Sequence, residues 1–339
     1  MKPIFKWLAA LSLALIISGI AITGWFYLDY QNFIQKPLNI PSSVQIYQIK
    51  KGMGMQSLAL DLKHQKIISA TQVWYVKYFS RVSNQQISLK AGRYQLPKQL
   101  NISVLLTIFH QGKTIQQAIT LIEGSTLKEI LQVIKKSTLF IHQLKSDMPL
   151  SEQLDIPIEN FEGWFFPDTY HLSEGTTDIQ FLKRLYRKMQ QILQAEWQNR
   201  AADLPLKNAY EALILASIIE KESAGRSERS RISGVFIKRL MIGMRLQTDP
   251  TVIYGMGDKF NGNIRRKDLR RDTIYNTYTR KGLPPTPICM PSKAAIHAAL
   301  HPNIDGSLYF VAKGQTGAHY FSKTLKEHNR AVRQYQLNK

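Results

Sequence analysis

The chain has 339 residues, with 45 lysines and arginines against 24 aspartates and glutamates, and its formal net charge is +21. This length allows a membrane anchor and two domains with a sizeable core, and the single cysteine, Cys289, excludes an intramolecular disulfide and a cysteine metal cluster. A strongly basic chain often binds nucleic acid, but no helix-turn-helix, RNP or zinc-finger spacing is present, so the charge favours an anionic polymer or an anionic membrane surface as partner.

The N-terminus carries Lys2 and Lys6, followed by an uncharged apolar segment at residues 7–28. This segment is long enough to cross a bilayer, and aromatic residues near both of its ends are typical of interfacial anchors. Because it ends in aromatic rather than small residues, we expect a retained single-pass anchor instead of a cleaved signal peptide. The basic flank, residues 1–6, predicts a cytoplasmic N-terminus at the inner membrane, with the rest of the chain in the periplasm.

A linker and a small domain are expected to follow the anchor. Residues 29–43 contain Pro37 and Pro41, which favours a linker. Alternating and amphipathic patterns then predict a mixed domain over residues 44–122. Its expected elements are strands at 44–49, 89–96 and 114–122 and helices at 55–65, 70–79 and 103–110.

The remaining residues, 123–339, are expected to form a larger domain that begins with a turn. Ser125 or Thr126 can cap a helix that runs to about Lys136. Farther along, the patterns predict helices at 181–200 and 293–300, strands at 308–312 and 319–321, and a last helix from about 323. Because helices and strands are interleaved irregularly, the sequence favours an α+β fold over a doubly wound sheet.

One helix of the larger domain holds a carboxylate in an apolar stretch. Residues 210–220 contain no glycine or proline and are mostly apolar, which predicts a buried helix that carries Glu220. A buried Glu either finds a partner or becomes protonated, and a desolvated Glu can act as a general acid near neutral pH. The alternative is that Glu220 lies at the exposed end of the helix and pairs with Lys221, Arg226 or Arg229.

Glu222 is the second candidate acid on this helix. Two residues are about 200° apart around a helix axis, so Glu220 and Glu222 are not expected to face one cleft. Glu220 follows two isoleucines, whereas Glu222 lies among Lys221, Ser223 and Gly225, where solvent is expected. The local pattern therefore favours Glu220.

Four segments carry a resemblance to a known family. They are 161–170 (FEGWFFPDTY), 216–222 (ASIIEKE), 241–255 (MIGMRLQTDPTVIYG) and 275–278 (YNTY). On these motifs, and over nearly its whole length, the chain resembles the endolytic murein transglycosylases, the YceG-like family. The resemblance implies that Glu220 is the catalytic residue and that residues 44–122 form a LysM-like domain, which either binds amino sugars or serves as a spacer.

Several polar residues are expected to surround the acid. Gln247, Thr248 and Asp249 would meet N-acetyl and hydroxyl groups of a sugar substrate. Asp249 has a second explanation, because Asp before Pro is a natural helix N-cap, and both readings stay open. Asn276 and Tyr278 offer an amide and an amphipathic ring, which are typical of a sugar-binding wall.

Two further carboxylates are candidates for the same cleft. Glu162 lies in the aromatic segment 161–170, although aromatic residues at such density more often form a core. The family resemblance implies that Glu123 faces the cleft. Helix capping by Ser125 or Thr126 is nevertheless a sufficient structural explanation for that turn.

The resemblance implies a lytic transglycosylase, which needs one carboxylate instead of the pair that most glycosidases use. Its Glu protonates the glycosidic oxygen that leaves N-acetylmuramic acid and then takes the proton of that sugar's C6 hydroxyl, which closes a 1,6-anhydro ring. No cofactor is expected, and the eight histidines show no ligand spacing that predicts a metal site.

The expected substrate is the glycan strand of murein, and no nucleic-acid partner is expected. The resemblance further implies that strands are cut as they are made, near peptidoglycan synthases such as penicillin-binding proteins. Two alternatives stay open at this point. One is a hydrolytic muramidase in which the same Glu activates water, and the other is a non-catalytic peptidoglycan-binding scaffold.

Overall fold

The computed structural model describes residues 2–41, 44–82, 88–222, 226–314 and 318–337. The chain divides into two compact units. The first unit comprises residues 1–117 together with 172–175, and the second comprises residues 118–171 and 176–339. Helices and short strands are mixed in both, which confirms the α+β expectation.

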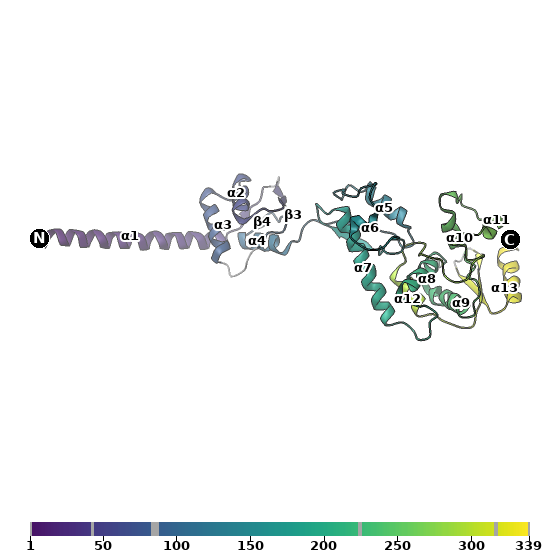
Figure 1. Cartoon of the computed structure of the whole chain (residues 1–339). Helices are drawn as coiled ribbons and strands as arrows, with labels where there is room; N and C mark the ends of the chain where they lie inside the picture. Colours follow the sequence, from purple (N-terminus) through teal and green to yellow (C-terminus); the bar gives the residue numbers. More distant parts are fainter. Residues whose placement is uncertain (1, 42–43, 83–87, 223–225, 315–317, 338–339) are drawn as a thin grey trace. The chain divides into compact units, whose positions relative to one another are not determined.

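The first helix, α1 (Lys2–Gln35), contains the expected apolar span (Figure 1). Its part Leu11–Gln35 is long and apolar enough to cross a membrane. Every side chain from Leu11 to Leu28 is exposed, including large apolar groups. An apolar surface of this length needs a non-aqueous surrounding, so the helix fits a membrane anchor.

The end of α1 differs from the linker that we expected at residues 29–43. Residues 29–35 are helical, and the side chains of Tyr30 and Phe33 are buried. The hydroxyl of Tyr75 donates a hydrogen bond of 2.7 Å to the Asp29 carboxylate. The last turns of α1 therefore belong to the core of the first unit, and the prediction of a linker is wrong for these residues.

The first unit combines two small antiparallel sheets with three helices besides α1. Its strands are β1 (Leu38–Asn39) paired with β4 (Gln99–Leu100), and β2 (Ile46–Ile49) paired with β3 (Gly92–Gln95). Its helices are α2 (Met55–His64), α3 (Ala70–Val82) and α4 (Ile102–Gln111). The three helices and two of the strands expected from the sequence are confirmed here, although the strands are shorter than predicted.

The second unit is mainly helical. Its helices are α5 (Leu127–Lys136), α6 (Leu150–Leu154), α7 (Asp178–Gln198), α8 (Ala209–Glu222), α9 (Arg229–Met241), α10 (Asp249–Met256), α11 (Arg266–Arg270), α12 (Lys293–Leu300) and α13 (Leu325–Val332). Short η helices occupy Arg226–Glu228, Gly257–Lys259 and Arg333–Leu337. Its strands are β5 (Gln117–Thr120) paired with β6 (Thr169–Leu172), and β7 (Tyr309–Ala312) paired antiparallel with β8 (His319–Ser322).

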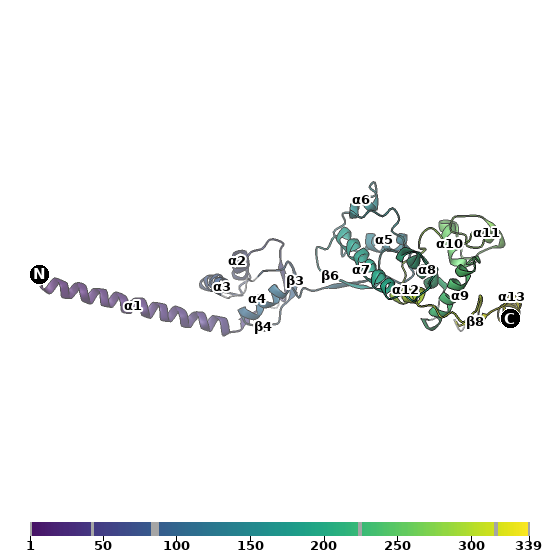
Figure 2. The ribbon, with the colours of Figure 1, turned by 60° about the horizontal axis from the view of Figure 1, so that its bottom comes forward.

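Helix α8 forms the centre of this unit. It packs against α7, α9, α10 and α12, and its contact with α12 is the most extensive (Figures 1 and 2). Every residue from Ala212 to Ile219 is buried. The predicted buried helix is thus confirmed, and it continues to Glu222.

The packing of the last turns of α1 against the first unit predicts a stability effect. Phe33→Ala removes a ring that is 4 % exposed, so we expect it to destabilise the first unit by about 3–5 kcal/mol. Trp25→Ala, at a residue that is 64 % exposed, is the matched control and should have little effect. Thermal unfolding of the full chain in neutral detergent measures both, and equal melting temperatures for the two variants would contradict the packing of residues 29–35.

Candidate functional site

The last turn of α8 carries two carboxylates that bind different neighbours. Glu220 is bound by residues of α9 and of the segment before α12. Glu222 is bound by the residue that precedes α10. This division follows from their spacing, because two positions along a helix point to nearly opposite sides.

Glu220 is held in a buried ion pair. The guanidinium of Arg229 donates to its Oε1 at 2.7 Å, and the side chains of Glu220 and Arg229 are only 6 % and 8 % exposed. Ser292 donates to its Oε2 from the backbone N–H at 2.9 Å and from Oγ at 2.5 Å. Pairing with Arg229 was the alternative reading of Glu220, although the pair is buried instead of lying at an exposed helix end.

Glu222 lies in a half-buried position at the end of α8. The hydroxyl of Thr248 donates a hydrogen bond to its Oε1. Burial raises the pKa of Glu222, and the nearby charge of Asp249 raises it further, against the opposing effects of Thr248, His319 and Arg239. We expected solvent around Glu222, but the structure gives it a half-buried position in which Thr248 binds it and the charges of Asp249, Arg239 and His319 act on it. Its local sequence does not reveal these neighbours.

Thr248 is fixed by a network of threonines. Its N–H donates to the Thr277 hydroxyl at 3.1 Å, and its carbonyl accepts from the Thr251 hydroxyl at 2.8 Å. Thr251 and Thr277 also lie within hydrogen-bond distance of each other, at 2.9 Å. Gln247 precedes this network with an exposed side chain and a left-handed backbone at φ 49°, a conformation that costs energy in a residue other than glycine.

Asp249 and Tyr278 complete the polar group around Glu222. The Tyr278 hydroxyl donates to Asp249 Oδ1 at 2.6 Å, and burial raises the pKa of Tyr278. Thr248 is the N-cap of α10 and Asp249 is its first residue, so the N-cap explanation for Asp249 is wrong by one position. Of the residues expected around an acid, the structure therefore brings Thr248, Asp249 and Tyr278 to Glu222.

Asn276 has a structural task inside the protein. It is 1 % exposed, and its amide nitrogen donates to the carbonyls of Arg271 at 2.7 Å and Leu269 at 3.1 Å. Its amide oxygen accepts the N–H of Tyr278 at 2.8 Å. Both ends of the amide are engaged, so we do not retain Asn276 as a contact to the sugar.

Glu162 is buried, with both carboxylate oxygens bound. Leu127 donates its N–H at 2.9 Å and Tyr254 its hydroxyl at 3.0 Å, which joins the start of α5 to α10. Burial raises the pKa of Glu162 to about 7, although these hydrogen bonds oppose the shift. Its position makes it a brace between two helices, and we do not carry the expected substrate contact forward.

Glu123 is exposed in the turn before α5. The neighbouring Gly124 donates its N–H to the carbonyl of Met290 at 2.8 Å and accepts from the Lys221 ammonium at 3.3 Å. The turn therefore lies against the end of α8. A direct role of Glu123 stays a prediction.

Sequence reasoning missed two residues near Glu222. Arg239 is buried and donates to the carbonyls of Leu246 at 2.5 Å and Leu308 at 2.7 Å. His319 on β8 lies 2.8 Å from the carboxylate of Glu228 through its Nδ1. Neither residue has a local sequence signal, because the fold alone brings α9 and β8 to the end of α8.

One group of described residues could hold a metal ion, and it lies on α7 and α12. Glu196, His297 and His301 offer ligand atoms that all lie within 4.8 Å of one another. The ammonium of Lys293 is 3.6 Å from Glu196 and competes for the same carboxylate. The sequence predicts no metal site because the histidines find this Glu only after α7 and α12 have packed.

Comparisons with known proteins agree on one family. A sequence model of the YceG-like family matches residues 47–334. The endolytic murein transglycosylase of Bacillus subtilis is 31 % identical over 328 residues, which cover 90 % of this chain and 89 % of that protein. The endolytic murein transglycosylase of Streptococcus pneumoniae is 26 % identical, and the match covers 91 % of this chain but 62 % of that longer protein.

A solved structure agrees with the fold as well. The crystal structure of a putative yceG-like protein from Listeria monocytogenes has a TM-score of 0.52 and 29 % sequence identity. The match covers 84 % of this chain and 98 % of that one. The arrangement of helices and strands described above is therefore shared with this relative.

The raised pKa of Glu162 predicts a pH dependence of stability. Its pKa is about 7 in the folded protein against an ordinary value of 4.5 for a Glu side chain, so the folded state binds more protons between these values and stability falls as the pH rises from about 4.5 to about 7. The loss amounts to at most about 3 kcal/mol. Glu162→Gln should flatten this decline in melting temperature, and a parallel decline in variant and wild type would contradict the assignment.

Proposed function

The chain belongs to the YceG-like family, and we propose that it is an endolytic murein transglycosylase held at a membrane by α1. The name of the relatives, which match along most of this chain, supports the activity. The half-buried carboxylate at the end of α8 supplies a group suited to the chemistry. The exposed apolar span of α1 supports the anchor.

Glu222 is the acid in this proposal, and Glu220 is its structural neighbour. One observation carries the assignment: burial raises the pKa of Glu222, and its described hydrogen-bond partner is the neutral hydroxyl of Thr248 instead of a cation. Such a carboxyl group can hold a proton near neutral pH and deliver it. Both oxygens of Glu220 already accept hydrogen bonds from Arg229 and Ser292, which suits a brace.

The reaction requires only this one carboxyl group. Protonated Glu222 gives its proton to the oxygen between N-acetylmuramic acid and the next N-acetylglucosamine, and the bond from C1 to that oxygen breaks. The C6 hydroxyl of the same muramic acid attacks C1, and its proton passes to the carboxylate of Glu222. The products are a free hydroxyl on one sugar and a 1,6-anhydro ring on the other, so no water is consumed.

The neighbours of Glu222 have distinct tasks in this scheme. Thr248 orients the carboxyl group through its hydrogen bond. The charge of Asp249 keeps the pKa of Glu222 raised and helps to stabilise positive charge that develops on the sugar ring. Tyr278 holds Asp249 in place and offers an aromatic face to a sugar.

We propose a finer placement of the enzyme. The short basic N-terminus favours residues 1–6 in the cytoplasm and the catalytic unit in the periplasm, where nascent glycan strands would be the substrate. Peptidoglycan synthases such as penicillin-binding proteins are the neighbours that would supply these strands. The first unit, LysM-like by sequence, lies between anchor and catalytic unit in the chain and would contact or space the glycan.

A hydrolytic muramidase is the second candidate, because Asp249 supplies the second carboxylate that hydrolases require. Mass spectrometry separates the two readings. The full chain in neutral detergent is incubated with uncross-linked glycan strands, and we expect 1,6-anhydro ends. Reducing ends, one water heavier, would establish the muramidase, and intact strands would leave a binding scaffold.

Two matched variants test the choice of acid. Glu222→Gln keeps the size of the side chain but removes its titrating proton, so we expect a folded protein whose activity is lower by about 10²–10⁴-fold. Glu220→Gln removes one charge of the buried ion pair with Arg229, so we expect a loss of stability by about 3–5 kcal/mol with measurable turnover below its melting temperature. Turnover at 20 °C and thermal unfolding are compared, and an inactive, stable Glu220→Gln beside an active Glu222→Gln would return the role to Glu220.

The charge of Asp249 predicts a shift of the pH profile. The acid must be protonated, so activity should fall as the pH rises through the raised pKa of Glu222. Asp249→Asn removes a charge that raises this pKa and should move the decline to lower pH. Asp258→Asn, an exposed site just beyond α10, should leave the profile in place, and an unshifted profile in Asp249→Asn would contradict the coupling.

A further inference from the structure

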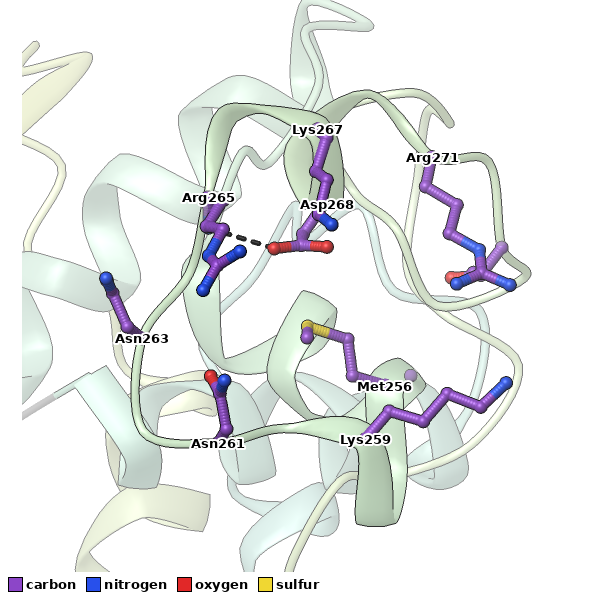
Figure 3. Close-up of a pocket in the computed structure, with 10 residues that line it drawn as sticks. Met256, Lys259, Asn261, Asn263, Arg265, Lys267, Asp268 and Arg271 are labelled. Atoms are coloured by element: carbon purple, nitrogen blue, oxygen red, sulfur yellow. Dashed lines mark hydrogen bonds between the residues drawn. The ribbon is translucent and has the colours of Figure 1, made fainter.

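A second polar site lies at the far end of α10, away from the residues that bind Glu222. It is a pocket of about 290 Å³ formed by the end of α10, the segment after it, α11 and the segment that follows α11 (Figure 3). Its lining residues are Gly255, Met256, Lys259, Asn261, Asn263, Arg265, Lys267, Asp268, Arg271 and Thr273.

The charge of this pocket is strongly positive. Lys259, Arg265, Lys267 and Arg271 face a single carboxylate, Asp268, which accepts the backbone N–H of Arg265 at 2.9 Å. Within the described ranges, none of these four cations forms an ion pair. Cations that gather without a protein countercharge repel one another, so the arrangement gains stability when an anion binds.

The polar lining includes more than cations. Figure 3 shows the side chains of Arg265 and Asn261 directed toward each other on one side of the pocket, and Lys259 and Arg271 on the other, with Met256 between them. Amide side chains can donate to and accept from peptide groups, and Met adapts its shape to apolar neighbours. The lining therefore suits a ligand that carries carboxylates, amides and methyl groups together.

Helix α10 connects this pocket to the acid site. Asp249 is its first residue and Met256 its last, so these two residues are about 10 Å apart along the helix axis. A Cβ at Gly255 would lie 3.0 Å from the Thr273 hydroxyl, so the end of α10 and the segment after α11 approach each other closely. Asn276 joins the carbonyls at the end of α11 to the backbone of Tyr278, so the two sites share one rigid frame.

We propose that this pocket binds the carboxylates of the peptide stem that murein carries on its muramic acid residues. The inference rests on the proposed function, since it requires a glycan strand in the acid site. A strand cut beside Glu222 extends along the surface in both directions, and its stems project from it. A stem has free carboxylates for Lys259, Arg265, Lys267 and Arg271 and amides for the asparagines, whereas a bare phosphate would use the cations alone.

Binding of a soluble murein fragment tests the proposal without turnover. The full chain carrying Glu222→Gln is kept in neutral detergent, and calorimetry measures its Kd for a disaccharide tetrapeptide and for the same fragment with its carboxylates converted to amides. The pocket variant adds Arg265→Gln and Arg271→Gln. The control adds Arg266→Gln and Arg270→Gln, which remove the same charge from the two ends of α11 without touching the lining.

We expect the pocket variant to raise the Kd of the free-acid fragment by about tenfold, which corresponds to about 1.4 kcal/mol. The control should change it by less than about twofold, and the amidated fragment should bind all proteins equally weakly. The proposal is overturned if the pocket variant binds the fragment unchanged, if the control loses as much affinity, or if the parent protein does not bind the fragment. It is also overturned if inorganic pyrophosphate displaces the fragment while amidation of the fragment has no effect.

The two proposals fail separately. Anhydro ends from the wild-type chain together with an unchanged Kd in the pocket variant would remove the stem site and leave the activity. If the pocket variant binds the free-acid fragment selectively more weakly but the wild-type chain cleaves no strands, the stem site stands and the chain is a binding protein.

Discussion

The buried ion pair between Glu220 and Arg229 is the constraint on which the second unit depends. It joins the end of α8 to the start of α9, and through Ser292 to the start of α12. A charge pair that is less than a tenth exposed is costly to form, and removing one partner is strongly destabilising because the other charge is already desolvated. The pair therefore fixes the rotation of α8 about its axis, and that rotation determines where Glu222 points.

Periodic patterns and caps predicted most of the helices. Residues 210–220 are apolar without a break, and the helix there is buried as expected. Thr126 and Glu129 form a capping box at the start of α5, in which the side chain of each accepts the backbone N–H of the other. Both residues lie within four positions, so the sequence alone predicts this cap. The end of α1 could not be predicted, because Tyr30 and Phe33 stand among polar residues and become core only by packing near Tyr75, more than forty residues along the chain.

The candidate site shows a sharper limit. The sequence indicates that Glu220 is buried, and it is, but pairing with Arg229 was expected only for an exposed Glu220, whereas the pair that forms is buried. Glu222 stands among polar residues and gains its environment from Thr248 and Asp249 on α10 and from His319 on β8, about a hundred residues away. Local composition reports how apolar the neighbours in sequence are, whereas acidity depends on neighbours in space.

The spacing of the two carboxylates unites these observations. An acid catalyst needs a desolvated side chain with little countercharge, and such a side chain destabilises the fold that holds it. Two residues away on the opposite side of the same helix, Glu220 contributes the rigid connection that this strain requires. One turn of helix thus carries both the strained group and its support.

Helix α10 likewise serves two sites: its first residue, Asp249, raises the pKa of Glu222, and its last residue, Met256, lines the basic pocket. A polymer bound in both places would be held in register by a single short helix, so that distance between the sites, and not flexibility, selects which bond lies beside Glu222.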